Sequence, residues 1–248
     1  MNKPILFTLI TVTYNAEKTL GRTLQSVATQ TYPHIEHILI DGASTDGTLQ
    51  IAQEQGKHLA HLISEPDRGL YDAMNKGLKL ATGDYVCFLN AGDKLHTQDT
   101  IERIVGEIEF VQKQNLPGVV YGETDIVDDN GYFLRPRHLT PPDQLDWQSF
   151  KHGMLVCHQA FYARRELCPE YDMHYRFSSD FDWCVKVLKQ AKDCHRLPFV
   201  VVDYLEEGVT TRNHRVSLIE RFRIMCKHYG FFTTLWNHFR FVVRAMTK

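Results

Sequence analysis

The stretch Tyr85–Asp93, YVCFLNAGD, joins a short apolar run to a polar turn. The run Tyr85–Leu89 has the length and the aromatic content of a buried β-strand. Asn90 and Asp93 lie in the turn that follows it. Two acidic residues at such a strand end would indicate a metal and a phosphate, yet Asn90 takes the place of one of them. The stretch therefore predicts either a metal site with a neutral substitute or a strand end with a simple turn.

Alternating strand and helix patterns surround this stretch in the first half of the chain. The order predicts an α/β fold with a mostly parallel mixed sheet and flanking helices, in which ligands bind at the carboxyl ends of the strands. Asn15 is placed to cap the first helix. The predicted strands are Ile5–Thr13, Ile35–Ile40, His61–Ser64 and Tyr85–Leu89, and the predicted helices are Ala16–Thr29, Thr48–Gln55, Leu70–Ala81 and Ile101–Gln114.

The second half of the chain has a less regular pattern. The tripeptide Asp129-Asn130-Gly131 is a hairpin turn signal between two strand-like runs. Two basic amphipathic helices, broken at Gly230, are expected at the C-terminal end. The predicted strands are Val119–Val127, Tyr132–Arg137 and Phe199–Tyr204, and the predicted helices are Ser179–Gln190, Ser217–Tyr229 and Phe232–Met246.

Length and cysteine content restrict the class of protein. The 248 residues suit one large domain, or one domain with an appendage. The six cysteines form no CxxC pair, which favours buried thiols in a reducing compartment. The run Ile5–Ile10 is too short for a signal peptide, and no stretch of 18 apolar residues predicts a transmembrane helix. We therefore expect a cytoplasmic location.

Positive charge gathers at the C-terminal end. Between Arg212 and Lys248 the chain has eight basic residues and one acidic residue, whereas the whole chain has a net charge of −2. Aromatic residues are interleaved with these cations, as in interfacial helices. A peripheral contact of residues 217–248 with the inner face of the membrane is one interpretation. A packed helical cap and a dimer interface, which would make the protein a homo-oligomer, are the alternatives. No nucleic-acid motif is present, so no nucleic-acid partner is expected.

Several common motifs of nucleotide enzymes are absent from the sequence. There is no GxGxxG fingerprint of a dinucleotide site. The segment Gly42–Thr48 has the glycine spacing of a P-loop, but Thr48 replaces the essential lysine. No HExxH, no zinc-like cysteine and histidine spacing and no GxSxG elbow occur. The sequence therefore argues against a dehydrogenase, an NTPase, a zinc enzyme and a serine hydrolase.

Four polar segments occur in one order along the first half. They are Thr11–Asn15 (TVTYN), Asp41–Thr48 (DGASTDGT), Glu65–Gly77 (EPDRGLYDAMNKG) and Gly83–Asp93 (GDYVCFLNAGD). In this order and spacing they resemble the family 2 glycosyltransferases with a GT-A fold, especially the bacterial WcaA-like branch that builds surface polysaccharides. The resemblance covers residues 5 to 95 and resumes at Ser178–Trp183. It implies a sugar transferase that uses a nucleotide-sugar donor.

The resemblance and side-chain chemistry together assign a nucleotide pocket. An aromatic ring at Tyr14 can stack on a base, and Thr13, followed by Tyr14 and Asn15, offers backbone and hydroxyl contacts. Asp41, next to Gly42, can accept a hydrogen bond from a uracil or guanine N–H. These residue types suit a base and a ribose.

The third segment is assigned to the rest of the donor by the resemblance. Asp67 is implied to help bind the nucleotide, and Arg68 to face a phosphate. Asn75 could line the donor pocket. Met74 stands where the family often has arginine, so a diphosphate contact from that position is not expected. A solvated loop and a helix surface are the alternative interpretations of Arg68 and Asn75.

The resemblance implies that Asp93 binds the metal. Mg²⁺ and Mn²⁺ prefer hard oxygen ligands and take the remaining ligands from water and substrate phosphates. The amide of Asn90 can contact the ribose or a metal-bound water, but it supplies no charge. A turn capped by Asp93 is the alternative.

Inverting sugar transfer needs a carboxylate that takes the proton of the acceptor hydroxyl. By resemblance Asp180 is this base, with Ser179 where the family commonly has glutamate. Asp182 is the rival candidate, and a helix cap is the alternative role of Asp180. His158, in the segment Cys157–Gln159, is expected on the acceptor side or as a core histidine.

These observations predict the domain organisation and the activity. Residues 1–211 form the GT-A domain, with a nucleotide-sugar half (1–95) and an acceptor half (96–211), and residues 212–248 form basic aromatic helices. The predicted reaction is an inverting, metal-dependent transfer from a nucleotide sugar, a UDP-sugar by family precedent, to a saccharide or a lipid-linked acceptor. The alternatives are a non-catalytic nucleotide-sugar-binding scaffold and a sugar-phosphate nucleotidyltransferase. The latter usually has a glycine-rich phosphate loop, which Thr13–Thr19 lacks.

Overall fold

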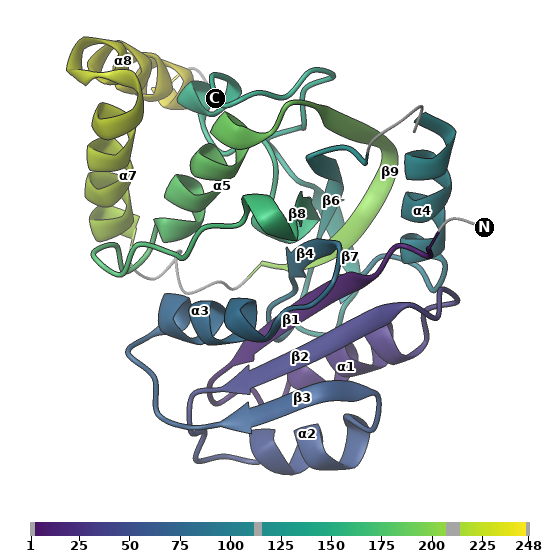
Figure 1. Ribbon diagram of the computed structural model, residues 1–248. Helices are drawn as coiled ribbons and strands as arrows, with labels where there is room; N and C mark the ends of the chain where they lie inside the picture. Colours follow the sequence, from purple (N-terminus) through teal and green to yellow (C-terminus); the bar gives the residue numbers. More distant parts are fainter. Residues whose placement is uncertain (1–2, 112–115, 207–213, 247–248) are drawn as a thin grey trace.

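A nine-stranded mixed sheet forms the centre of the protein (Figure 1). The structure, a computed structural model, describes residues 3–111, 116–206 and 214–246. The strand order is β3-β2-β1-β4-β8-β6-β9-β5, and β7 pairs with β6 beside this path. The strands are β1 (Phe7–Thr13), β2 (Ile35–Asp41), β3 (Leu59–Ser64), β4 (Tyr85–Phe88), β5 (Lys94–Leu95), β6 (Val119–Val127), β7 (Phe133–Pro136), β8 (Phe161–Arg164) and β9 (Cys194–Leu205).

The first four strands form the parallel part of the sheet. β1 is parallel to both β2 and β4, and β2 is parallel to β3. Thr13 at the end of β1 is paired with Asp41 at the end of β2, and Asp41 is paired with Ser64. The carboxyl ends of these strands therefore meet at one edge, as the sequence predicts.

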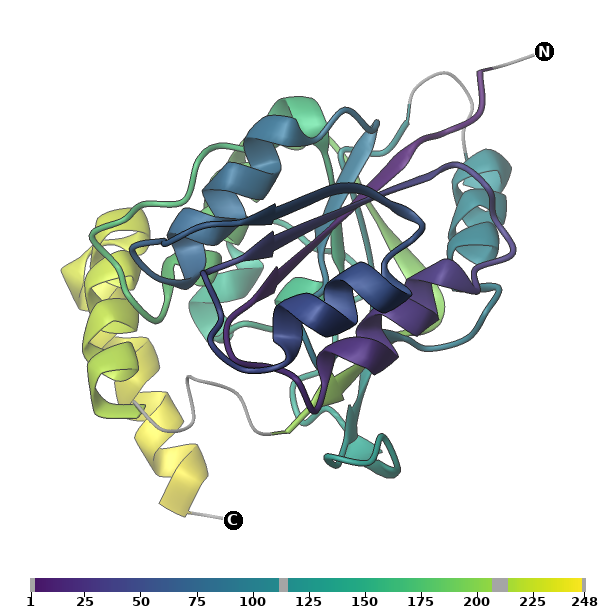
Figure 2. The same cartoon turned by 90° about the horizontal axis from the view of Figure 1, so that it is seen from below.

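Helices cover both faces of this parallel part. In the view from below (Figure 2), α1 and α2 lie on one side of strands β1–β3, and α3 lies on the other side. Leu20, Leu24, Leu39 and Ala52 form a buried cluster between α1, α2 and β2. The helices are α1 (Leu20–Ala28), α2 (Thr48–Gln55), α3 (Leu70–Leu80), α4 (Thr100–Val111), α5 (Ser179–Gln190), α7 (His214–Tyr229) and α8 (Phe231–Met246), with short 3-10 turns at Ser149–His152, His158–Ala160 and Arg165–Leu167.

The second half completes the sheet with mixed pairing. β8 lies antiparallel between β4 and β6, whereas β6 and β9 are parallel. Two strands, β5 and β8, do not appear in the sequence prediction, and β9 is longer than the predicted Phe199–Tyr204. Both missed strands are short, with only two and four residues, and depend on pairing with distant partners. The α/β fold class is confirmed.

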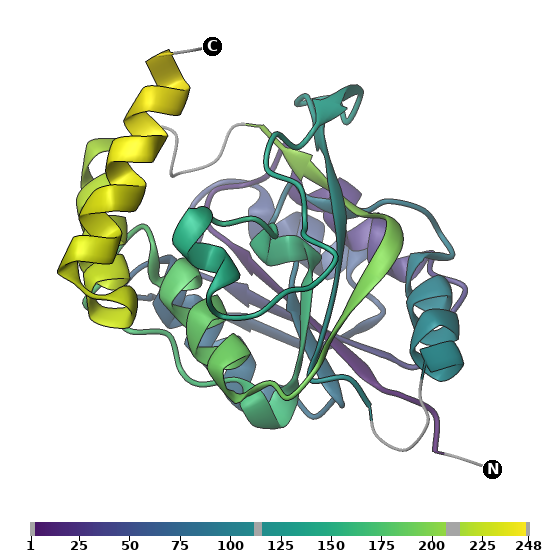
Figure 3. The same ribbon diagram turned by 90° about the horizontal axis from the view of Figure 1, so that it is seen from above.

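The first helix is shorter than the sequence predicts, and the last two helices pack against each other. α1 begins at Leu20 rather than Ala16, so the predicted helix cap at Asn15 is wrong. At the other end α7 and α8 form a helical hairpin on the outer side of the molecule, next to α5 (Figure 3). Within the three described ranges, no helix has the length and apolar character needed to cross a bilayer.

Candidate active site

Three loops meet at the carboxyl edge of β1–β3. Tyr14, directly after β1, is 64 % exposed, and Thr13 Oγ1 is buried without a hydrogen-bond partner among the described residues. A Cβ atom on Gly42 would clash with Asp67 Oδ2 and would lie 3.4 Å from Tyr14 Cδ2. Glycine is therefore the residue that lets the Asp67 carboxylate approach the backbone. An open aromatic ring, a carboxylate and a bare backbone thus share one surface, which suits a nucleoside.

Asp41 lies in the interior of the protein, although the sequence predicts a contact with the nucleotide base. Its side chain is fully buried. One carboxylate oxygen accepts hydrogen bonds from the Ser44 N–H at 3.0 Å and from Ser64 Oγ at 2.7 Å, and the other accepts from Ser44 Oγ at 2.5 Å. The carboxylate holds the loop after β2 and presents no surface to a ligand. In this arrangement Asp41 positions Gly42 instead of contacting a base itself.

Asn15 connects the first two loops. It adopts a left-handed backbone conformation, with φ of 50°, which asparagine tolerates better than most residues. Its Oδ1 accepts a hydrogen bond from the Thr45 N–H at 2.9 Å, and its own N–H donates to Ser44 Oγ at 2.8 Å. Asn15 thereby fixes the backbone that carries Tyr14.

Arg68 pairs with a neighbouring acid in this structure. Its guanidinium donates to Asp72 Oδ1 at 3.0 Å, one helical turn along α3, and its side chain is 78 % exposed. Such an exposed pair contributes little to stability. Lys76, by contrast, bonds Glu65 at 2.8 Å and the carbonyl of Pro66 at 2.9 Å, next to Asp67. Arg68 and Lys76 therefore bond to other residues of the same segment.

Asn75 does not line an open pocket, contrary to the sequence prediction. It is only 6 % exposed. Its Nδ2 donates to the carbonyl of Tyr171 at 3.1 Å, and its Oδ1 accepts the N–H of Tyr171 at 2.7 Å. Asn75 therefore pairs with the backbone of a loop from the second half, as a neighbouring strand would. Its role is to join the two halves beside the site.

The stretch that follows β4 forms a tight oxygen-rich turn. The Asp93 N–H donates to the Asn90 carbonyl at 3.0 Å, and Gly92 between them has a φ of 107°, which favours glycine. Asn90 Oδ1 is buried and has no hydrogen-bond partner among the described residues. Asp93 is 3 % exposed, and its Oδ1 accepts the N–H of Leu205 at 2.9 Å.

The electrostatics of this turn fit a cation. Burial raises the pKa of the Asp93 carboxyl to about 7, although hydrogen bonds from Leu205 and Gln159 and the charge of Arg22 oppose the shift. A carboxylate that is costly to ionise and an unpaired amide oxygen would both gain from a positive charge. Both are hard oxygen ligands of the kind that Mg²⁺ and Mn²⁺ prefer. The residues present therefore fit a divalent cation.

Asp180 lies in the first turn of α5 and is partly exposed. Its Oδ1 accepts a hydrogen bond from the Tyr71 hydroxyl at 3.1 Å and from the Phe181 N–H at 2.9 Å. These bonds fix the carboxylate without covering it. Tyr71 was not singled out by the sequence, because the two residues lie 109 positions apart.

Asp182 has the opposite environment, with no exposed surface. Lys186 lies 2.5 Å from one carboxylate oxygen, and His228 donates to the other at 2.7 Å. Burial alone would raise the pKa of Asp182, but the bonds from His228 and Lys186 outweigh it and lower the pKa to about 2. The Lys186 ion pair lies within α5, and the bond from His228 connects α5 to α7. The structure thus favours Asp180 over Asp182 as a group that can meet an acceptor.

Tyr204 lies near the end of β9, and charges from both halves of the chain affect its pKa. Burial is the main cause of its raised pKa, and the charges of Asp93 and Asp180 raise it further. Asp93 follows β4 in the first half, and Asp180 begins α5 in the second. Both carboxylates therefore lie within electrostatic reach of one phenol. No local pattern in the sequence points to Tyr204.

His158 belongs to the core behind the site. It is 4 % exposed, stacks on Phe88 with ring centroids 5.2 Å apart, and shares a hydrogen bond of 2.7 Å with the Tyr171 hydroxyl. Burial lowers its pKa to about 4, so the ring is neutral near pH 7. Of the two predicted roles, the structure supports the core histidine.

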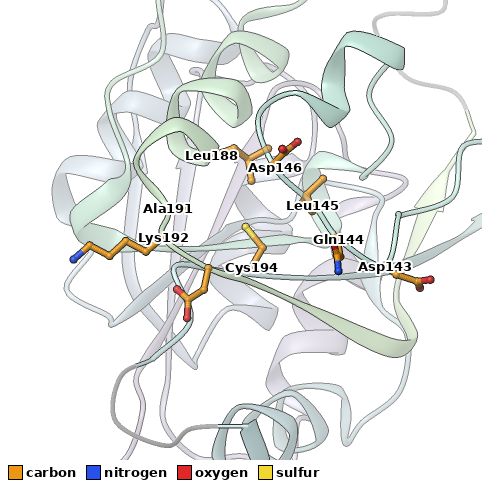
Figure 4. Close-up of a pocket in the computed structure, with 9 residues that line it drawn as sticks. Asp143, Gln144, Leu145, Asp146, Leu188, Ala191, Lys192 and Cys194 are labelled. Atoms are coloured by element: carbon orange, nitrogen blue, oxygen red, sulfur yellow. The ribbon is translucent and has the colours of Figure 1, made fainter.

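Two other features involve residues that the sequence does not single out. His96, Asp125 and Asp203 bring ligand atoms within 4.8 Å of one another, but Lys94 already lies 2.9 Å from Asp203 and supplies a positive charge. A cavity of about 210 Å³ lies at the C-terminal end of α5, the opposite end from Asp180 (Figure 4). It is lined by residues 143–146, Leu188 and residues 191–194. Neither feature contains a predicted site residue.

Comparison with solved structures agrees with this fold. Residues of this chain superpose on a crystal structure of S. aureus TarS in complex with UDP-GlcNAc with a TM-score of 0.71, at 21 % identity over 89 % of this chain. The mannosyltransferase PcManGT of Pyrobaculum calidifontis, in complex with GDP-Man and Mn²⁺, gives a TM-score of 0.61 at 19 % identity over 92 % of this chain. The chain spans 64 % of each of these two chains. At such identities the likeness shows the fold alone, and it is the GT-A fold.

Sequence relatives carry the family assignment. A PGL/p-HBAD biosynthesis glycosyltransferase of Mycobacterium tuberculosis is 33 % identical over 218 residues, which cover 84 % of this chain and 77 % of the relative. The amylovoran biosynthesis glycosyltransferase AmsB of Erwinia amylovora is 28 % identical over 75 % of this chain and 65 % of its own length. The family model described as "Glycosyl transferase family 2" matches residues 8–171. A chain with this sheet edge and these relatives is a glycosyltransferase, and it belongs to glycosyl transferase family 2.

Proposed function

We propose that this protein transfers a sugar, with inversion, from a UDP-sugar to a saccharide or lipid-linked acceptor in the synthesis of a surface polysaccharide. The observation that carries the proposal is the hydrogen bond of 3.1 Å between Tyr71 on α3 and Asp180 on α5, which brings a carboxylate of the second half against the helix that follows the donor loop. A transferase needs one group near the donor diphosphate and another near the acceptor hydroxyl. Asp93, after β4 in the first half, and Asp180, in the first turn of α5 in the second half, would be these two groups.

The donor would occupy the edge formed by the loops after β1, β2 and β3. Tyr14 would stack on the base, with the Gly42 backbone and the Asp67 carboxylate beside it. Asp41 and Asn15 would hold these loops in shape through their hydrogen bonds to Ser44 and Thr45. The TarS complex with UDP-GlcNAc supports a uridine nucleotide by analogy of fold.

Asp93 and Asn90 would hold a divalent cation. When bound, Mg²⁺ or Mn²⁺ neutralises charge on the diphosphate leaving group. The PcManGT complex, which contains Mn²⁺ together with GDP-Man, supports this assignment by analogy of fold. Asn90 contributes an oxygen without charge, so Asp93 provides the negative charge of the turn.

Asp180 would act as the general base. The acceptor oxygen attacks the anomeric carbon, the bond from that carbon to the diphosphate oxygen breaks, and the acceptor proton passes to the Asp180 carboxylate. The single displacement inverts the anomeric configuration. Tyr71 keeps the carboxylate in place by donating to Oδ1.

A donor screen tests the proposal. Purified protein is mixed with UDP-, GDP-, dTDP- and CMP-sugars with and without Mn²⁺, and the thermal unfolding temperature is measured. A UDP-sugar should raise this temperature only with the metal, because a ligand that binds the native state stabilises it. The anomeric configuration of any product is then read by NMR. Stabilisation by no nucleotide sugar, or a retained configuration, would contradict the proposal.

A further inference from the structure

Helix α8 turns its apolar face away from the protein. Phe232, Trp236 and Phe239 are 84 %, 63 % and 60 % exposed, and Leu235 is 50 % exposed. Their spacing of three and four residues places them on one side of the helix. A helix on the surface of a water-soluble domain ordinarily buries such a stripe. Four large apolar side chains on one exposed helix face call for a specific partner.

The side of α8 that faces the protein is partly polar instead. Thr234 is fully buried and Asn237 is 4 % exposed. Each donates a hydrogen bond to the backbone of the helix itself: Thr234 Oγ1 donates to the Gly230 carbonyl and Asn237 Nδ2 to the Thr233 carbonyl, both at 2.8 Å. The amphipathic character of α8 is therefore inverted. Its apolar stripe faces outward, and Thr234 and Asn237 face the protein.

The charge of the α7–α8 hairpin indicates what covers this stripe. Arg215, Arg223 and Arg240 are exposed on it, whereas Lys227 lies 3.5 Å from Asp182 and 3.6 Å from Asp172. Glu220 is the one acidic residue between positions 214 and 246, and it is buried, with its carboxylate accepting the N–H groups of Arg176 and Phe177. The hairpin surface is therefore positive as well as aromatic, a combination that binds anionic lipid headgroups and the acyl region below them.

We propose that α8 lies in the plane of an anionic lipid surface, with the stripe Phe232, Leu235, Trp236 and Phe239 inserted and the basic side chains among the headgroups. A second copy of this chain is a less suitable occupant, because it would bring the same cations against one another. Leu218 and Ile219 of α7, 44 % and 55 % exposed, extend the apolar surface of the hairpin.

The hairpin is fixed to the element that carries Asp180. Ser217 Oγ on α7 lies 3.0 Å from Ser178 Oγ, directly before α5. Glu220 receives the N–H groups of Arg176 and Phe177 at 2.8 Å each. A lipid-bound hairpin would therefore hold the start of α5 in a set orientation to the surface. This consequence rests on the proposed function, and it favours an acceptor presented at that surface.

Vesicle co-sedimentation of the full chain tests the proposal without nucleotide or acceptor, so its outcome is independent of the transferase activity. Vesicles of phosphatidylglycerol and phosphatidylcholine are compared with vesicles of phosphatidylcholine alone. We expect clear binding to the anionic vesicles and much weaker binding to the neutral ones. The double variant Trp236→Ser/Phe239→Ser should lose at least about tenfold in vesicle affinity, with an unchanged circular dichroism spectrum.

Phe110→Ser provides the matched control. Phe110 is 87 % exposed on α4, so its replacement removes an equally open aromatic ring from another surface, and vesicle affinity should stay unchanged. Three results would overturn the proposal: no binding of the wild type to anionic vesicles, equal losses in the control and the double variant, or a lipid-free dimer in analytical ultracentrifugation that the double variant abolishes. The last result would identify the stripe as an interface between copies.

Discussion

The Tyr71 hydroxyl donates to Asp180 Oδ1 across 3.1 Å, and so joins α3 to α5 at the candidate base. Tyr71 is 4 % exposed and stacks on Tyr171, with ring centroids 5.4 Å apart. The backbone of Tyr171 is in turn bonded by Asn75. Tyr71, which orients Asp180, therefore packs where the two halves of the chain contact each other.

Replacing Tyr71 by phenylalanine should slow transfer while leaving donor binding intact. The ring and its stacking on Tyr171 stay, but the hydrogen bond that orients Asp180 is lost. We expect kcat to fall roughly tenfold with an unchanged dissociation constant for UDP. Tyr32→Phe is the control, because the Tyr32 hydroxyl bonds the Ile5 carbonyl at 2.8 Å, far along the sheet from this edge. Equal effects of the two variants would reduce Tyr71 to a structural role.

Asp180→Asn should lower the rate of transfer, whereas Asp182→Asn should lower the stability of the protein. The first removes a partly exposed carboxylate, and we expect transfer to fall by about 10²- to 10⁴-fold with stability and UDP binding retained. The second leaves Lys186 and His228 without their buried partner, so we expect a loss of about 3 kcal/mol in the free energy of unfolding. Steady-state kinetics and urea unfolding distinguish the two. An active Asp180→Asn protein would move the base elsewhere.

The two oxygen ligands of the turn after β4 should differ in their effect on metal dependence. In Asp93→Asn the charge is lost, and Mn²⁺ should no longer strengthen UDP binding in calorimetric titrations. In Asn90→Asp a second carboxylate is added, and UDP affinity in Mn²⁺ should rise, roughly threefold to tenfold. Wild-type UDP affinity that is the same with and without metal would refute this assignment.

Stability should fall below pH 6.5 because of a buried histidine. His37 is 1 % exposed, with Nε2 2.9 Å from Thr11 Oγ1 and Nδ1 2.9 Å from His58 Nε2. Burial, and then the charge of His58, lowers its pKa to about 3. Between pH 6.5 and 3 the unfolded chain binds a proton that the folded chain excludes, so stability rises with pH through this window and levels off above it.

The size of this pH effect on the unfolding free energy follows from the one proton that His37 binds in the unfolded chain but not in the folded chain. From pH 7.5 to 5.0, His37 alone should cost about 2 kcal/mol of unfolding free energy, at about 1.4 kcal/mol for each pH unit below 6.5. Urea unfolding at the two pH values measures the total change. His37→Gln keeps a polar side chain without this titration, so the wild type should lose about 2 kcal/mol more than the variant. Identical pH dependence of the two proteins would contradict this role of His37.

The local sequence pattern was sufficient to predict most helices and strands of the fold. The predicted bounds of α2, α5 and β6 agree with the structure, because each has a clear period and a clear end. Strand β8 was missed since four residues carry no reliable period, and it exists through its pairing with β4 and β6. β5 has only two residues and was missed for the same reason.

The site was predictable in position but only partly in role. The order of the four segments placed Tyr14, Asp67 and Asp93 near one sheet edge, because parallel strands end together. The roles of Asn75 and Asp182 depend on Tyr171 and His228, which lie 96 and 46 positions away. Such long-range hydrogen bonds leave no local signal in the sequence.

Gly42→Ala should weaken donor binding without unfolding the protein. The new Cβ would clash with Asp67 Oδ2, so the carboxylate must swing away from the loop after β2. Because the conflict is with the end of a side chain, we expect stability to change by less than about 1 kcal/mol, while UDP affinity falls at least about tenfold. Gly106→Ala is the control, since a Cβ there meets no atom within 4 Å. Calorimetry with UDP and thermal unfolding of both variants give the two numbers. Undiminished UDP binding in Gly42→Ala would remove Gly42 and Asp67 from the donor site, whereas a selective loss would locate the nucleoside where these two residues meet.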